Sequence, residues 1–247
     1  MAELGPTRDK NPRTGSPLLA VERLEGWYGE SHVLHGVTFD VREGEVVTLL
    51  GRNGAGKTTT LKAIMGVLGQ RSGSVKFNGQ EMIGLPSREI ARAGIAFCPE
   101  ERGIFSSLSV EENLLLPPQV KPGGMTVEQI YELFPNLKER LSSPGTMLSG
   151  GEQQMLAIGR ILRTGSKMLL LDEPTEGLAP VIVKQIGRTI AKLKKEGFTI
   201  VLVEQNFRFA STVADRHYVV EQGEVIDTFT SEELEQNLDK LRAYLGV

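Results

Sequence analysis

The sequence predicts an α/β fold in which helices cover a buried sheet. A helical segment interrupts the alternation of strands and helices along the chain. Short apolar runs at residues 46–50, 168–171 and 198–203 have the length and composition of strands buried on both faces. A helix with one apolar face, predicted over residues 181–195, separates the last two runs, and this alternation is typical of a doubly wound sheet. Between residues 100 and 147 the composition changes to helical segments broken by Pro and Gly.

The front third of the chain is predicted to be mixed α and β structure. Its predicted strands lie at residues 18–24, 33–42 and 74–77, besides the run at 46–50. A helix over residues 59–65 follows that run. Residues 69–73 break the pattern, and the turn Asn78-Gly79 predicts an edge hairpin.

The segment from about 100 to 147 is predicted to be an inserted helical subdomain with a surface of its own. Two capping boxes mark helix starts, Ser109 with Glu112 and Thr126 with Gln129. The predicted helices run over residues 109–116 and 126–134.

The α/β order resumes after this segment. A helix over residues 150–163 is expected to bury its apolar face. Strands at residues 218–220 and 225–226, joined by a turn at Gln222-Gly223, and a final helix over residues 232–244 complete the prediction.

Composition argues against several classes of protein. The formal net charge of −3 offers no general surface for nucleic acid, and we expect no nucleic-acid partner. The apolar runs are far shorter than the roughly 18 residues of a membrane span. Residues 1–17 are polar, lack the apolar core of a signal peptide and predict a disordered tail.

Cysteine and histidine are rare in this chain. With one cysteine, Cys98, an internal disulfide is impossible, and three scattered histidines, His32, His35 and His217, predict no Cys–His metal site. Cys98 is expected to be a small buried strand residue without a functional role.

Residues 51–58 (GRNGAGKT) form a glycine-rich segment between a strand and a helix. Glycines let several backbone N–H groups point at one anion, and the helix start adds the positive end of its dipole. We therefore predict a P-loop for a nucleoside triphosphate, because a turn that contains Lys-Thr by chance would not need the flanking strand and helix. Lys57 can reach the β- and γ-phosphates, and the Thr58 hydroxyl can ligate Mg²⁺. The predicted nucleotide-binding residues of this segment are Gly51, Arg52, Asn53, Gly54, Ala55, Gly56, Lys57, Thr58 and Thr59.

Two carboxylates, Asp172 and Glu173, follow the buried run at 168–171. Ligands of open α/β sheets collect at the carboxyl ends of the strands. We expect Asp172 to hold Mg²⁺, directly or through a ligand of the ion, and Glu173 to polarise a water for attack on the γ-phosphate. Alone, an Asp-Glu pair would indicate an acidic helix start; the P-loop upstream favours the catalytic interpretation.

A second glycine-bearing helix start lies at residues 148–154 (LSGGEQQ). Ser149 and Glu152 predict a capping box, while Gly150 and Gly151 leave the N–H groups of the first turn bare. A capping box alone does not explain two adjacent glycines, which are poor helix formers. We predict that Ser149, Gly150, Gly151 and Glu152 bind a different nucleotide from the one in the P-loop.

These motifs and their order resemble the ATP-binding-cassette family over nearly the whole of residues 18–247. Residues 51–58 look like its Walker A motif, 148–153 its signature motif, and 168–173 its Walker B motif with the catalytic glutamate. The resemblance implies an ABC ATPase: a P-loop NTPase core with an antiparallel β subdomain and an inserted helical subdomain. It also implies that two domains pair head to tail, so that the signature motif of one closes over the ATP of the other. Tyr28 matches the aromatic residue that stacks on adenine.

Three positions depart from the general family pattern. Glu100 stands where most members have a glutamine, Gln205 where most have a switch histidine, and Ala179 where an aspartate is common. Glu100 can ligate Mg²⁺ more strongly than an amide, and Gln205 can donate to a γ-phosphate oxygen but carries no charge. We therefore expect Glu100 at the metal, Gln205 among the catalytic residues, and altered hydrolysis at this site.

Several phrases resemble one of the two ATPase subunits of high-affinity branched-chain amino-acid importers. They include PE at 99–100, VEENL at 110–114, YELFP at 131–135, GLAP at 177–180 and VEQN at 203–206. The resemblance implies ATP hydrolysis that energises import at the cytoplasmic face of the inner membrane. It implies as partners a second ATPase subunit, identical or different, two membrane permeases and a periplasmic solute-binding protein.

Three alternatives accompany this interpretation. A related branch imports urea or short amides and usually has a glutamine after the proline, so Glu100 favours the amino-acid branch. A soluble cassette of DNA repair or chromosome structure is the second alternative. Such a cassette needs long coiled coils between its motifs, and none fits between residues 58 and 148. A regulatory cassette with weak hydrolysis, suggested by Gln205, stays open.

Overall fold

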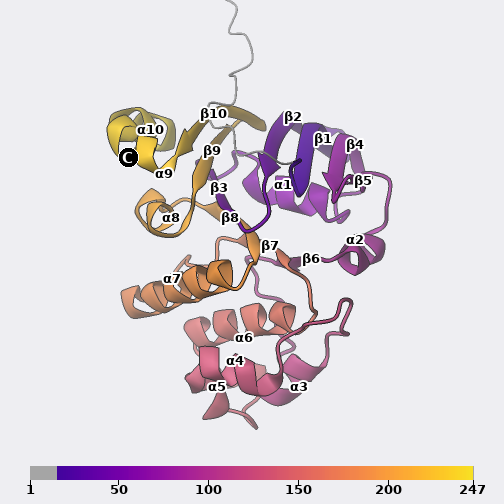
Figure 1. The fold of residues 1–247 in the computed structure, drawn as a ribbon, viewed down its shortest axis with the longest axis vertical. Coiled ribbons are helices and arrows are strands. Elements are labelled where there is room, and N and C mark those ends of the chain that lie inside the picture. Colours follow the sequence, from indigo (N-terminus) through magenta and orange to yellow (C-terminus); the bar gives the residue numbers. More distant parts are fainter. Residues whose placement is uncertain (1–15, 247) are drawn as a thin grey trace, which may run out of the picture.

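The described part of the chain forms two sheets (Figure 1). The computed structural model describes residues 16–246, so the first fifteen residues of the predicted tail lie outside the described part. Within that part no helix is both long and apolar enough to cross a membrane. The six-stranded sheet consists, in spatial order, of β10 (Glu224–Thr230), β9 (Arg216–Glu221), β3 (Val46–Leu50), β8 (Thr199–Glu204), β7 (Met168–Asp172) and β6 (Ile95–Cys98).

The centre of this sheet is parallel and buried. β3 pairs in parallel with β8 and β9, β7 with β8, and β6 with β7, whereas β10 runs antiparallel to β9 at one edge. All residues of β3, β7 and β8 are buried. Layers on both faces explain why these strands are apolar runs without alternation.

The second sheet is antiparallel and four-stranded. In spatial order it contains β2 (Ser31–Val41), β1 (Leu19–Tyr28), β4 (Gln70–Phe77) and β5 (Gln80–Glu81). β4 begins within the stretch predicted to break the pattern, because Gln70 to Ser72 pair with β1 despite their polarity. Gly73, at φ 100°, lies at the irregularity in this pairing, where a Cβ would lie 2.2 Å from the Arg23 carbonyl oxygen.

Helices pack against the sheets. They are α1 (Lys57–Ile64), α2 (Ser87–Ala93), α3 (Val110–Leu115), α4 (Val127–Leu133), α5 (Pro135–Lys138), α6 (Gly150–Leu162), α7 (Pro180–Lys195), α8 (Phe207–Val213), α9 (Ser231–Leu234) and α10 (Leu238–Leu245), with 3₁₀ turns η1 (Gly145–Met147) and η2 (Glu235–Asn237). Figure 1 shows α6 between α7 and the group α3 to α5. Whether the helical stretch from about 100 to 147 is a subdomain of its own stays a prediction.

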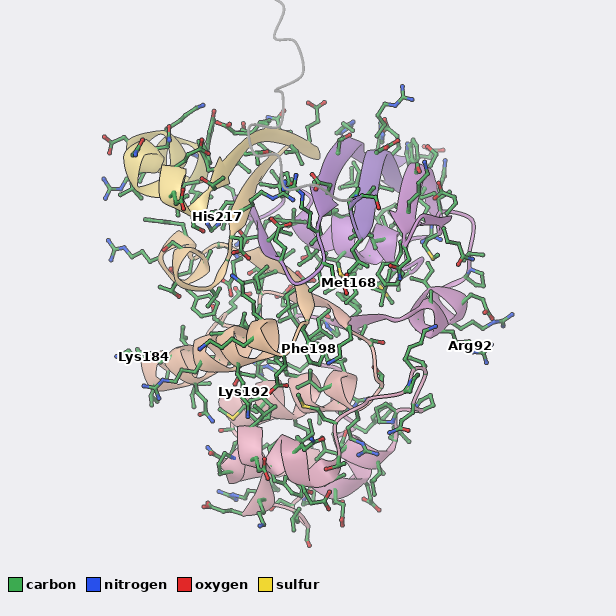
Figure 2. The ribbon with its side chains drawn as sticks, viewed as in Figure 1. Arg92, Met168, Lys184, Lys192, Phe198 and His217 are labelled. Carbon is green, nitrogen blue, oxygen red and sulfur yellow. The ribbon has the colours of Figure 1, made fainter. Side chains whose placement is uncertain are left out.

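The apolar core has a part on each side of the central sheet. One cluster fills the space between the antiparallel sheet, α1 and β3, and a second joins the central sheet to α6, α7 and the helices beyond. Met168 and Phe198 lie inside, whereas Arg92 on α2 and Lys184 on α7 lie at opposite outer edges (Figure 2). Cys98 is buried as expected, and burial raises the pKa of its thiol to about 12.

Several local predictions are confirmed and others are wrong. Ser109, Thr126 and Ser149 each form the predicted capping box. The predicted single helix over 232–244 is wrong, because the chain divides there into α9, η2 and α10. The Asn237 side chain donates to the Glu233 carbonyl oxygen at 2.8 Å, an alternative to regular helical bonding at the break. No helix was predicted at α2 or α8, each of which has seven residues.

Candidate functional site

The predicted site residues follow four neighbouring parallel strands. β3, β8, β7 and β6 lie side by side, so their carboxyl ends meet at one edge of the sheet. The P-loop follows β3 and Gln205 follows β8. Asp172 ends β7 and Glu173 comes next, while Glu100 follows β6 after Pro99. Sheet order thus brings together residues that are far apart in the sequence.

The P-loop turn is closely fitted to the rest of the fold. A Cβ on Gly51 would lie 2.3 Å from the Val220 carbonyl oxygen, and Gly56, at φ 103°, occupies the left-handed N-cap position of α1. The Gly223 N–H donates to the Ala55 carbonyl oxygen at 2.9 Å, so the turn between β9 and β10 supports the loop. Residues with side chains could not replace these glycines without moving the loop.

Lys57 is buried at the start of α1. Its Nζ donates to the Gly51 and Arg52 carbonyl oxygens at 2.9 and 3.0 Å and lies 3.4 Å from a Glu173 carboxylate oxygen. The Lys57 side chain therefore folds back over the P-loop. In this position it can exchange its carbonyl partners for the oxygens of a phosphate.

Asp172 and Thr58 form an oxygen-rich pair beside Lys57. The Thr58 hydroxyl donates to Asp172 Oδ1 at 3.0 Å, while Asp172 Oδ2 is buried and has no hydrogen-bond partner among the described residues. Burial raises the pKa of Asp172 to about 6, and the charges of Glu173 and Glu100 act in the same direction. A hydroxyl and an unsatisfied buried carboxylate oxygen are a donor set that suits a hard divalent cation.

Glu173 is held by backbone and side-chain contacts in an unusual backbone conformation. Its φ is 44°, in the left-handed region, and its N–H donates to the Val203 carbonyl oxygen at 3.0 Å. Gln205 Nε2 donates to Glu173 Oε2 at 2.6 Å, and Lys57 faces the other carboxylate oxygen. Gln205 therefore holds Glu173 in this structure, a contact that the sequence did not predict.

Two further carboxylates near Glu173 were not among the predicted site residues. Burial raises the pKa of Glu204 to about 7, although the Thr175 hydroxyl donates to Glu204 Oε1 at 2.7 Å. The pKa of Glu176 is raised by its hydrogen bond with Glu173 and by burial, and the charge of Glu100 adds to the effect. The sequence signal that could have identified Glu204 is its position at the end of the apolar strand β8.

The second predicted phosphate-binding turn lies exposed at the start of α6. The Ser149 N–H and hydroxyl both donate to Glu152 Oε2, at 2.8 and 2.7 Å. A Cβ on Gly151 would lie 3.0 Å from two atoms of Ile182 on α7, so packing explains this glycine. On Gly150 the nearest atom would be 3.4 Å away, in Arg102. Packing alone therefore does not require Gly150 to be a glycine.

Two other predicted nucleotide contacts have distinct settings. Tyr28 ends β1 with 49% of its surface exposed, which leaves a face open for stacking. Arg52 instead directs its guanidinium to α10, donating to the Tyr244 and Ala243 carbonyl oxygens at 3.1 and 3.3 Å. For both residues, contact with nucleotide stays a prediction.

A glycine turn that opens a helix at the carboxyl edge of a parallel sheet, with a buried lysine and carboxylates around it, defines a P-loop nucleotide-binding protein. Comparison with known families narrows this class. The profile of the ABC transporter family matches residues 34–176, more than half of the chain, and the chain belongs to that family. It is an ATP-binding cassette with the fold of an ABC ATPase.

Known relatives match almost the full chain. It is 45% identical over 238 residues to the high-affinity branched-chain amino acid transport ATP-binding protein BraG of Pseudomonas aeruginosa, across 93% of this chain and 100% of BraG. It is 35% identical to the lipopolysaccharide export system ATP-binding protein LptB of Escherichia coli K12, across 92% of this chain and 97% of LptB. The probable branched-chain amino acid transport ATP-binding protein LivF of Archaeoglobus fulgidus is 35% identical, across 88% of this chain and 94% of LivF.

Solved structures confirm the predicted fold class. A nucleotide-free ATP-binding cassette from an ABC transporter aligns with a TM-score of 0.81 and 26% identity, across 94% of this chain and 99% of that one. A dimeric bacterial ABC transporter cassette aligns with a TM-score of 0.76 and 26% identity, across 86% of this chain and 98% of that one.

Proposed function

We propose that this chain binds and hydrolyses ATP to energise the import of branched-chain amino acids. The 45% identity to BraG along the full length of that relative carries the proposal. Identity to the lipopolysaccharide-export relative is lower, at 35%. The partners would be a second ATPase subunit, two membrane permeases and a periplasmic solute-binding protein, with the cassette at the cytoplasmic face of the membrane.

In this proposal the P-loop amides and Lys57 bind the phosphates of ATP, and Tyr28 stacks on adenine. Thr58 and Asp172 would hold Mg²⁺, with Glu100 nearby, which is supported by the buried Asp172 oxygen that has no hydrogen-bond partner within residues 16–246. The ion would supply positive charge that neutralises the phosphate oxygens. Glu173 would accept a proton from the attacking water, and Gln205 would orient its carboxylate through the 2.6 Å hydrogen bond.

The transport function is tested in proteoliposomes that contain the permeases and a binding protein for branched-chain amino acids. ATP hydrolysis should rise when the binding protein carries leucine, whereas urea with its own binding protein should have no effect. Glu173→Gln should lower hydrolysis by about 10²- to 10⁴-fold with nucleotide binding intact, because the general base is lost. Lys57→Ala should abolish nucleotide binding.

Glu22→Gln is the matched control, since Glu22 is an exposed glutamate in the antiparallel sheet. It should hydrolyse ATP at the wild-type rate. Equal rates for wild type and Glu173→Gln would remove Glu173 as the catalytic group and favour a regulatory cassette. Stimulation by urea instead of leucine would assign the chain to the amide branch.

We further propose that the exposed turn at Ser149 closes over the nucleotide of a second cassette. Support comes from its exposure, from the bare first turn at Gly150, and from a similar cassette that is dimeric. Ser149→Arg should leave nucleotide affinity unchanged and abolish ATP-dependent pairing, because the long cation fills the contact. Sedimentation of the Glu173→Gln protein with ATP, with and without Ser149→Arg, measures this. Normal pairing of the double variant would refute the shared site.

A further inference from the structure

We propose that Glu25, His32 and His35 form a binding site for a divalent transition-metal ion, with Zn²⁺ as the best match. The expectation that Cys98 and three scattered histidines build no Cys–His metal site did not consider the pairing of β1 with β2, which brings two histidines and a glutamate together. One ligand atom from each of these residues lies within 4.8 Å of the other two. We call this group the hairpin cluster.

The antiparallel register creates the cluster. Glu25 on β1 pairs with His35 on β2, and Trp27 pairs with His32 closer to the turn, beyond an irregularity in the pairing between Gly26 and Trp27. Positions 25 and 27 share a face of β1, so the partners meet on the same side of the sheet. His32 Nε2 lies 2.5 Å from Glu25 Oε2, and the rings of His32 and His35 are 4.1 Å apart between centroids.

Neighbouring groups restrain the ring of His32 and the backbone of His35. The Trp27 ring stacks on His32 with centroids 4.5 Å apart and planes 9° from parallel. The backbone N–H of His35 donates to the Gly223 carbonyl oxygen at 2.9 Å, which fixes the main chain of β2 at this position against the turn between β9 and β10. The His32 ring and the main chain at His35 would therefore lose little conformational freedom when an ion binds.

The donor set determines the kind of ion. Two imidazole nitrogens and one carboxylate oxygen suit Zn²⁺ and, less selectively, Ni²⁺ or Cu²⁺, whereas Mg²⁺ and Ca²⁺ prefer oxygen ligands alone. Both histidines are exposed and Glu25 is half-buried, so an ion can enter from solvent and keep a water as its fourth ligand. The cluster therefore differs in chemistry from the Thr58 and Asp172 pair.

The test uses the full chain without a polyhistidine tag, freed of metal by a chelator. Zn²⁺ is titrated against a chromogenic chelator in excess Mg²⁺, which occupies oxygen-only sites. We expect one Zn²⁺ per chain, and X-ray absorption at the zinc edge should report two imidazole ligands. His217, the third histidine of the chain, is fully buried, with its ring nitrogens bonded to Thr48 and Ser231. Two imidazoles would therefore identify His32 and His35.

His32→Ala and His35→Ala should each weaken Zn²⁺ binding by at least about tenfold, because a direct ligand matters at least as much as the groups that orient one. Glu30→Gln removes an exposed carboxylate from the same hairpin turn and should bind as wild type does. Thermal unfolding without metal shows whether each variant is folded. The proposal is overturned if folded histidine variants keep wild-type affinity, if Glu30→Gln loses it equally, or if fewer than two imidazoles are found.

Discussion

Lys57 lies beside Glu173, whose charge adds to the effect of burial in raising the pKa of two other carboxyls, those of Asp172 and Glu204. Its amine is 3.4 Å from Glu173, and burial raises the pKa of Asp172 to about 6 and that of Glu204 to about 7. Replacing buried charged groups by apolar residues of similar volume is often neutral or stabilising, so such a group contributes little to stability. The arrangement is therefore what a binding site for ions and phosphates requires and what a structural core avoids.

His217 provides a pH-dependent part of the stability. Burial lowers its pKa from 6.5 to about 4, so between these values the unfolded chain binds a proton that the folded chain does not. Stability from this group is full above pH 6.5 and falls as the pH drops to 4, by about 3 kcal/mol in total. His217→Gln should therefore lose less unfolding free energy than wild type between pH 7.5 and pH 4.5. Urea denaturation at both pH values measures this, and equal losses would contradict it.

The two glycines at the start of α6 differ in role. Packing requires Gly151, whereas Gly150 is available for a ligand. Gly151→Ala should have a free energy of unfolding about 1 to 3 kcal/mol lower than Gly150→Ala, because the Cβ of the alanine at position 151 would crowd Ile182. Gly150→Ala should keep or raise stability, since Ala is the better helix former, by up to about 1 kcal/mol in a helix interior and by less in the first turn, where Gly150 lies. It should still weaken ATP-dependent pairing, because its Cβ would lie beside the bare N–H groups. Urea denaturation and sedimentation test the pair. Equal stabilities, or normal pairing of Gly150→Ala, would contradict this division.

Elements with strong local signals were predictable from the sequence. The strand Val46–Leu50 and the start of α6 at Gly150 match their predicted positions, because apolar runs and capping boxes are local. α8 was missed because its helical signal is short and its Asn206 cap does not carry a capping box. The bond from Gln205 to Glu173 and the hairpin cluster depend on strand pairing, which no local pattern specifies.

The spatial order of the strands in the central sheet determines where the motifs lie in the molecule. Residues 51–58 and 172–173 are distant in sequence, but β3 and β7 are separated by β8 alone. The ends of these strands therefore form one edge, and Gln205, after β8, lies where it bonds to Glu173. Recognition of the separate motifs was possible from sequence, whereas their mutual contacts follow from topology.

Arg52 connects the P-loop to the last helix of the chain. Its guanidinium donates to the Tyr244 and Ala243 carbonyl oxygens, which lie in the last turn of α10, where helix carbonyls lack intrahelical partners. Arg52→Ala should therefore speed amide hydrogen exchange in α10 several-fold, while the free energy of global unfolding changes by less than about 1 kcal/mol. Mass spectrometry of peptides over residues 238–246 measures the exchange. Arg88→Ala, which removes an exposed arginine on α2, is the control and should leave α10 unchanged. If α10 exchanges equally fast in wild type and Arg52→Ala, this contact does not hold the C-terminal helix against the nucleotide-binding loop.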